Sequence, residues 1–383
     1  MTGDRAKQPC AMKIRYRRVV TEPAIAIDVL PAGYGDSLLI ECPVEGGTWR
    51  LLIDTGPDEC WPALKDRLSR IAPNRQGKRH IDLAVISHID HDHIGGASLL
   101  FSDTTLNLSF GDVWFNAPPR PATRGVAEGQ ALASLIGAGD VRLPWNEAFH
   151  GRAVVTASDI PFVEIPSAPG LPRITLLSPG PAQLARLFKV WDRELAKLRR
   201  KESDKPAAAV RATRGNITLD PVALAARKSA VDRATANGSS IAFLLEHKSA
   251  SVLLAADAFA TVLAPALKAL ARHRKIPEPM KLDAFKLSHH ASRANITKDL
   301  LDRVQARHYV VSTNGAFFGH PNDEAIAKVV VYGGAAPRVW FNFDNDRSRR
   351  WSDPALQARH GFLAILPKPG RSGLTLQLTG ASE

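Results

Sequence analysis

Short apolar runs separated by turn residues dominate the start of the chain. The first three are Ala24–Leu30, Ser37–Glu41 and Trp49–Ile53, and a glycine-bearing turn, Pro31–Asp36, joins the first two. Runs of this length bounded by glycine, proline and aspartate are typical of β-strands. A fourth run, Ile81–Ser87, is mostly apolar, which predicts a strand buried on both faces.

The rest of the chain repeats this pattern with helical segments in between. Apolar spacing predicts helices at Trp61–Ile71 and Thr261–His273. Further strands are expected at Val113–Asn116, Ala153–Thr156, Ile174–Leu177, Ser240–Glu246, Ser251–Ala256, Phe285–Ser288, Tyr309–Ser312, Val339–Phe343, Phe362–Leu366 and Leu374–Leu378. Strands in both halves with helices between them indicate an α/β protein.

Residues 181–237 have a different composition. They are rich in Ala, Leu, Lys and Arg and helical by propensity. The stretch Arg193–Lys205 holds six basic and three acidic residues. We expect one domain over residues 1–383 with a helical, basic insertion at 181–237. The basic stretch is either a nucleic-acid contact or, more commonly for such a pattern, an exposed charged helix.

Composition and charge restrict the class of protein. The chain has 383 residues, of which 45% are hydrophobic and 23% charged, so it is not a disordered chain. Three cysteines without a CxxC pair fit a reducing compartment. Met1–Val20 lacks the apolar core of a signal peptide, and no apolar run could span a membrane, so we expect a cytoplasmic protein without a membrane partner. A net charge of +12 suits an anionic partner such as nucleic acid, although it also simply aids solubility.

The segment Ser87–Gly96 carries the strongest chemical signal. It holds three histidines within six residues, interleaved with Asp90 and Asp92. Alternate residues share a face, which places His88 with Asp90, whereas Asp92 and His93 point elsewhere and suit a second metal. Imidazole and carboxylate ligands suit Zn, Mn or Fe. The alternative is a solvated turn, which so many ligand-type residues after a buried strand make improbable.

This segment resembles the His-x-His-x-Asp-His signature of the metallo-β-lactamase superfamily, with Asp90 in place of the second histidine. The substitution, followed by Gly-Gly, looks like the soluble metallo-β-lactamase-like domain of competence (DNA-uptake) proteins and their stand-alone relatives. Asp28–Ser37 resembles the opening Asp-Val-Gly-x-Gly-Asp motif, and Ile53–Gly56 resembles the strand turn before the metal motif. The resemblance implies a four-layer α/β/β/α sandwich and a hydrolase with two divalent metal ions, Zn or Mn.

Later motifs supply further expected ligands through the same resemblance. Asp257, after the apolar run Leu253–Ala256, resembles the aspartate that bridges both metals, although it could be an ordinary residue at a strand end. The pair His289-His290 resembles the family's His-His-Gly-Ser. It implies that His289 completes the second metal site and that His290 faces the substrate. A structural histidine pair is the alternative.

The closing Gly-His-Pro motif contains His320, which by resemblance could contact a phosphate or the leaving group, or else only cap a turn. Asp92 is expected to hold a hydroxide at the metals, with His290 or His320 assisting.

The third ligand of the first metal is the weakest point of the resemblance. His150 lies at about the spacing at which the wider superfamily supplies a histidine. Without it, the first site holds only His88, Asp90 and Asp257, and this oxygen-rich set favours Mn or Mg over Zn. His91 is expected to support the ligands or to face solvent.

These features predict a metal-dependent hydrolase, most of all a phosphodiesterase or nuclease with nucleic acid or another phosphate-bearing substrate. The alternatives are hydrolysis of a small ester, such as a phosphocholine diester, lactone or thioester, and an effector subunit of a multi-protein system that docks a protein partner through the insertion. Hydrolysis of β-lactams is disfavoured because no export signal is visible and Asp90 replaces a histidine.

Overall fold

The computed structural model of this protein describes residues 22–118, 143–203 and 219–380, with side chains described in the long helix 181–203 only as far as residue 196. The described strands form two sheets. The first sheet runs in the order β14 (Leu374–Leu378), β1 (Ile25–Val29), β2 (Leu38–Val44), β3 (Gly47–Ile53), β4 (Arg79–Val85) and β5 (Leu108–Trp114). The second runs in the order β13 (Leu363–Ile365), β12 (Arg338–Phe341), β11 (Val304–Val311), β10 (Met280–Lys286), β9 (Ala250–Leu254), β8 (Ala242–His247), β7 (Arg173–Ser178) and β6 (Val163–Ile165).

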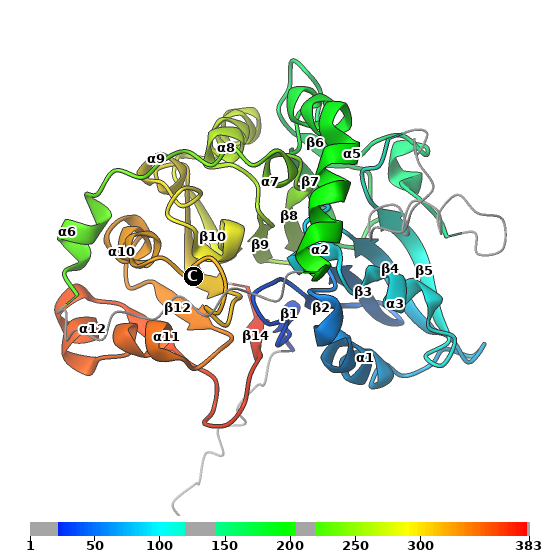
Figure 1. Ribbon diagram of the computed structural model, residues 1–383, viewed down its shortest axis with the longest axis horizontal. Coiled ribbons are helices and arrows are strands. Elements are labelled where there is room, and N and C mark those ends of the chain that lie inside the picture. The colour runs from blue at the N-terminus through cyan, green and yellow to red at the C-terminus, as the bar shows by residue number, and fades with distance from the viewer. Residues whose placement is uncertain (1–21, 119–142, 204–218, 381–383) are drawn as a thin grey trace, which may run out of the picture.

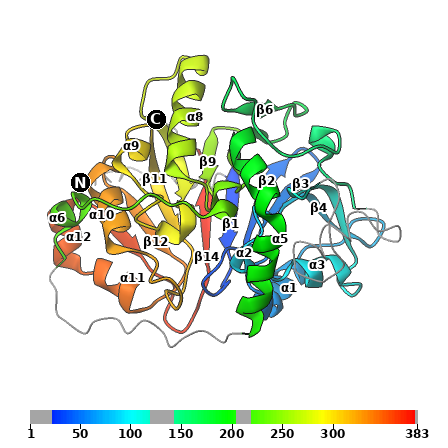
Figure 2. The same ribbon diagram turned by 45° about the horizontal axis from the view of Figure 1, so that its top comes forward.

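Helices cover the outer face of each sheet (Figure 1). One group comprises α1 (Trp61–Ser69), α2 (His91–Ile94), α3 (Ala97–Ser102) and α5 (Pro181–Ser203). The other comprises α6 (Pro221–Ala225), α8 (Ala260–Arg274), α9 (Lys298–Leu301), α10 (Asp323–Tyr332), α11 (Asp346–Trp351) and α12 (Pro354–His360), while α7 (Thr235–Gly238) packs against α5. Figure 2 shows α1, α3 and α5 on one side of the molecule and α8 to α12 on the other.

The alternation of side chains along the strands explains this layering. In β3, Leu51 and Ile53 pack between the sheets, whereas Leu52 packs against the helices outside. In β8, Phe243 packs between the sheets and Leu244 faces α8. Each sheet is therefore apolar on both faces, which requires a cover on both. The expected α/β/β/α arrangement is confirmed.

Several sequence-based expectations for strands need correction. Ala153–Thr156 forms no strand, because side chains and a loop satisfy its backbone: Val154 exchanges two hydrogen bonds with the Asn116 amide, and the Thr156 N–H donates to the Pro179 carbonyl. A short strand, β6, forms after it instead. Three expected strands start earlier than predicted, those at Val113–Asn116, Phe285–Ser288 and Tyr309–Ser312, which are β5, β10 and β11.

The segment 181–237 is helical at both of its described ends. Helix α5 packs Leu184, Leu187 and Trp191 against the outer core of the first sheet, so these apolar side chains are buried within the fold. The backbone of the basic stretch is helical as far as Ser203, while Asp204 and Lys205 lie outside the described residues. The one-domain organisation and a partner that docks on this segment stay predictions. None of the described helices is long and apolar enough to cross a membrane.

Candidate metal centre

The expected ligands come from three loops that follow strands of both sheets. His88 to His93 follow β4 in the first sheet, and Asp257 and the His289–His290 pair follow β9 and β10 in the second. The turn before β2 closes over them: a Cβ on Gly35 would lie 1.8 Å from the carbonyl oxygen of Asp92. Only glycine permits this contact, which explains the glycine in the opening motif.

Four buried groups form one half of the site, which we call the second-metal cluster: Asp92, His93, Asp257 and His290. The Nε2 of His290 lies 3.3 Å from Asp92 Oδ2, and the Nε2 of His93 lies 3.3 Å from Asp257 Oδ1. The separations are 4.0 Å from His93 Nε2 to Asp92 Oδ2 and 3.8 Å from His290 Nε2 to Asp257 Oδ1.

The other half, the first-metal cluster, consists of His88, Asp90 and the second oxygen of Asp257. The Nε2 of His88 lies 3.9 Å from Asp257 Oδ2 and 3.8 Å from Asp90 Oδ2. His289 approaches the same oxygen, with its Nε2 3.7 Å from Asp257 Oδ2. The two oxygens of Asp257 thus face different clusters, which is the arrangement a bridging carboxylate needs.

The side chains of both clusters fit metal ions because several of their potential ligand atoms are buried without a hydrogen-bond partner. The Nε2 atoms of His88, His93 and His290 and the Oδ1 atom of Asp257 are buried and form no hydrogen bond. Buried polar atoms are usually hydrogen-bonded. Two ligands at about 2.1 Å from one tetrahedral ion would lie about 3.4 Å apart, close to the shorter separations measured. A pair of divalent cations would therefore satisfy atoms that the protein leaves without partners.

The far side of each imidazole is fixed by the protein. The Nδ1 of His93 lies 2.8 Å from Asp54 Oδ2, and Asp54 also accepts hydrogen bonds from the Ser87 N–H and hydroxyl. The Nδ1 of His290 donates to the Ser312 carbonyl at 2.8 Å. Such bonds orient the other nitrogen toward a metal and set its tautomer.

A buried ion pair, Lys286–Asp36, lies next to the second-metal cluster and contacts His290. Lys286, on β10, donates to Asp36 Oδ2, and both side chains are at most 3% exposed. The other oxygen of Asp36 lies 3.3 Å from His290 Nδ1, and the Asp36 N–H donates to the Asp92 carbonyl. The loop before β2 therefore holds two residues of the cluster in place.

The charges of the site are strongly coupled. Burial disfavours charge on His93, yet the Asp257 and Asp54 carboxylates outweigh it and hold the pKa of His93 well above its usual value. Burial likewise opposes charge on His290, but Asp36 and Asp257 raise its pKa to about 10. Burial and the neighbouring His93 lower the pKa of His88 to about 4. A metal would displace protons from His93 and His290, so metal binding tightens as the pH rises.

The backbone decides which histidine of the pair faces which group. His289, His290 and Ala291 all have positive φ, of 51°, 51° and 64°. This conformation is uncommon for residues with a Cβ and persists where the surroundings fix it. It turns His290, rather than the expected His289, toward Asp92 and His93. His289 instead places its Nδ1 3.1 Å from Asp232 Oδ2.

The remaining predicted residues lie at different distances from the clusters. His320 is buried, its ring centroid is 4.9 Å from that of His289, and its Nδ1 has no hydrogen-bond partner. Burial and the His289 and His290 charges lower the pKa of His320 to about 3. His150 is exposed and belongs to none of the metal-type clusters of the described residues.

His91 lies in another group. Its Nδ1 is 3.1 Å from the Tyr34 hydroxyl and its Nε2 is 3.1 Å from Asp58 Oδ1. Together with Glu59 it forms a more exposed cluster, with Asp58 and Glu59 at the surface.

Sequence reasoning assigned no role to three residues of this site. Asp54 lies in the strand turn already noticed, where an aspartate after a buried strand is a usable signal. Lys286 is a charged residue at the end of an apolar strand, which is a weaker signal. Asp232 comes from the 181–237 segment, and no feature of the sequence points from there to His289.

One sequence-family model matches most of this chain. The sequence-family model described as the metallo-beta-lactamase superfamily matches residues 30–315. No curated protein matches the chain significantly. Among solved structures, the diiron beta-hydroxylase CmlA from Streptomyces venezuelae is 14% identical with a TM-score of 0.38, and the match covers 92% of this chain and 54% of CmlA. The metallo-beta-lactamase fold protein YhfI from Bacillus subtilis is 10% identical with a TM-score of 0.37, over 92% and 99% of the two chains. This chain therefore spans about half the length of CmlA.

Proposed function

Since this chain belongs to the metallo-beta-lactamase superfamily, we propose that it is a metal-dependent hydrolase and that its substrate is a phosphodiester. The observation that carries the first part is the convergence of buried, unpartnered ligand atoms from both sheets on one point. The net charge of +12 supports the second part, because it attracts polyanions and makes their binding salt-dependent.

In this proposal, Asp92, His93, Asp257 and His290 would hold one divalent ion, and His88, Asp90 and Asp257 would hold another. Zn and Mn both suit the nitrogen and oxygen donors, with Mn favoured where carboxylates predominate. When bound, such ions lower the pKa of a water molecule toward neutrality and polarise a phosphoryl oxygen.

His289 is the best candidate for a proton donor. Burial opposes charge on this imidazole, but Asp257 and Asp232 raise its pKa. Its Nδ1–H donates to Asp232, which leaves Nε2 on the Asp257 side as the atom that gives a proton to the leaving oxygen. His320, with its lowered pKa, is neutral and positions the substrate by hydrogen bonding. This assignment exchanges the roles that the sequence suggested for His289 and His290.

The test is hydrolysis by the purified protein. Bis(p-nitrophenyl) phosphate and single- and double-stranded DNA and RNA are incubated with the protein and Mn, Zn or Fe. We expect metal-dependent cleavage that is lost in Asp92→Asn and His93→Ala. The matched control is His91→Ala, which removes a histidine of the same loop that contacts Tyr34 and Asp58 instead.

A parallel panel of carboxylic esters, lactones and thioesters tests the alternative substrate class. Cleavage of that panel without cleavage of any phosphodiester would contradict the phosphodiesterase assignment while retaining the metal-dependent hydrolase. Phosphodiester cleavage that survives both Asp92→Asn and His93→Ala would contradict the proposed site.

A further inference from the structure

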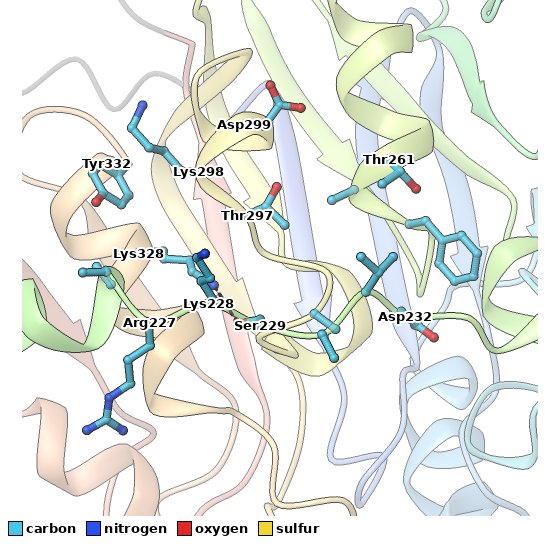
Figure 3. Close-up of a pocket in the computed structure, with 17 residues that line it drawn as sticks. Arg227, Lys228, Ser229, Asp232, Thr261, Thr297, Lys298, Asp299, Lys328 and Tyr332 are labelled. Carbon is cyan, nitrogen blue, oxygen red and sulfur yellow. Dashed lines mark hydrogen bonds between the residues drawn. The ribbon is translucent and has the colours of Figure 1, made fainter.

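A cavity lies next to the metal centre, on the helical side of the second sheet. It measures about 420 Å³, and its walls are residues 225–232, the start of α8 and parts of α9 and α10 (Figure 3). This volume falls within the range of small-molecule pockets. None of the proposed metal ligands lines it.

Lys328 is the unusual residue of this pocket. Its side chain comes from α10, and the residue is only 5% exposed. Its ammonium group donates to Ser229 Oγ at 3.1 Å and to the Arg293 carbonyl at 3.3 Å, both of which are neutral acceptors. Within the described residues, no carboxylate lies within ion-pair distance of it. The nearby Glu324 is instead shared by two arginines, Arg227 and Arg293, at 3.6 Å each.

A buried cation without an anionic partner costs free energy, and proteins rarely retain one without a use for it. The other charges of the lining do not supply that partner. Asp232 and Asp299 each contact a cation outside the pocket, at 3.1 and 3.4 Å. Lys228 adds a further exposed cation next to Ser229, and Figure 3 shows Lys228 and Lys328 extending into the same part of the pocket.

The lining of the pocket also includes apolar side chains. Ala230, Val231 and Phe259 line it, and Phe259 offers an aromatic ring. The pocket therefore combines a cationic end with an apolar wall, a combination that suits an organic anion rather than a bare ion.

We propose that this pocket binds the phosphate group of an organic phosphate, with the phosphate against Lys228 and Lys328 and the organic part against Val231 and Phe259. A phosphate dianion complements two ammonium groups and the Ser229 hydroxyl better than a carboxylate does. This binding needs no metal ion and no hydrolysis, so it goes beyond the proposed function.

The pocket has a direct link to the metal centre. Asp232 lines its wall and accepts a hydrogen bond from His289. A ligand in the pocket therefore lies one side chain away from the proposed proton donor.

The experiment is calorimetric titration of the protein with phenyl phosphate, and with benzoate for comparison, both as purified and after metal is removed with a chelator and dialysis. We expect saturable binding of phenyl phosphate that survives metal removal, with benzoate bound at least tenfold more weakly. Lys328→Met should weaken phenyl phosphate binding about tenfold or more, as expected for loss of a charge-assisted contact.

The matched control is Lys268→Met, which removes an exposed lysine of α8 that lies outside the pocket, and it should leave the affinity unchanged. Should Lys328→Met fail to fold, Lys228→Met, an exposed position, replaces it and should weaken binding several-fold. An affinity for phenyl phosphate within twofold of wild type in Lys328→Met, or in Lys228→Met where that replaces it, would overturn the proposal. So would binding that disappears with the metal, because the ligand would then occupy the metal centre. Failure of phosphodiester hydrolysis leaves this result unaffected, so the two proposals fail separately.

Discussion

The two halves of the metal centre differ in how deeply their ligands are buried and in how firmly these ligands are oriented. The second-metal cluster takes ligands from both sheets, its side chains are at most 12% exposed, and its histidines are oriented by hydrogen bonds that their Nδ1 atoms make to Asp54 and to the Ser312 carbonyl. The first-metal cluster relies on one loop for His88 and Asp90, and the Asp90 side chain is 30% exposed. A closed ligand set favours tight holding of a metal, and an open one leaves positions for water or substrate. From this comparison we expect an ion to be held more tightly in the second cluster than in the first.

The largest effect is expected where the two halves meet. Asp257→Asn removes a negative charge from both clusters and places an amide N–H₂ donor or a weak carbonyl ligand on each side. Because both ions lose a carboxylate ligand, hydrolysis should fall by roughly a thousandfold or more. The check is the rate of bis(p-nitrophenyl) phosphate cleavage at saturating Mn. A loss below tenfold would mean that Asp257 does not bridge.

Variants of the two halves should differ from each other. His290→Ala removes a buried ligand of the second-metal cluster, whereas Asp90→Ala removes a half-exposed ligand of the first. We expect metal titrations to show loss of the tightly held ion in His290→Ala and loss of only the weakly held ion in Asp90→Ala. The activity of His290→Ala should fall about a hundredfold and not return at high metal concentration, whereas that of Asp90→Ala should partly return. Equal behaviour of the two variants would remove the distinction between the clusters.

The orienting bond to His93 gives a smaller effect. Asp54→Asn keeps the size of the side chain but replaces one of its two oxygens by an amide nitrogen, which cannot accept a hydrogen bond. In one orientation of the amide this nitrogen faces His93 Nδ1, and in the other it faces the Ser87 N–H. Partners of this kind are typically worth about 10- to 100-fold in metal affinity. The measurement is competition with a fluorescent chelator, and Asp112→Asn, on the strand next to β4 and away from the clusters, is the control. An unchanged metal affinity would show that the bond does not support the site.

The smallest effect is expected outside both halves. His91→Ala removes the histidine whose nitrogens face Tyr34 and Asp58, so hydrolysis and metal content should change less than about threefold, within ordinary surface effects. A loss as large as that of His93→Ala would place His91 within the metal centre and contradict the ligand assignment.

The sequence allowed much of this fold to be predicted because the strands are short apolar runs that end in recognisable polar turns. Ile53-Asp54 and Leu254 to Asp257 illustrate this: a buried strand is followed at once by an acidic residue. Ala153–Thr156 misled the prediction because it is apolar and extended, yet its hydrogen bonds go to Asn116 and Pro179 rather than to a neighbouring strand.

The site was less accessible to prediction. The spacing of histidines and aspartates located the loops, but the choice between His289 and His290 depends on consecutive residues with positive φ, which the sequence does not reveal. Asp232 meets His289 only through the path of a distant segment of the chain. His150 shows the opposite failure, because its spacing matched while its side chain is exposed.

Metal content is the most direct test of the central claim, that the buried atoms of Asp92, His93, Asp257 and His290 hold a metal ion. Wild-type protein is loaded with Zn or Mn, passed through a desalting column and analysed by inductively coupled plasma mass spectrometry beside Asp257→Asn and His91→Ala. The account predicts at least one ion retained per chain in the wild type and in His91→Ala, with near-complete loss in Asp257→Asn. Wild-type protein that retains no more metal than Asp257→Asn would contradict it.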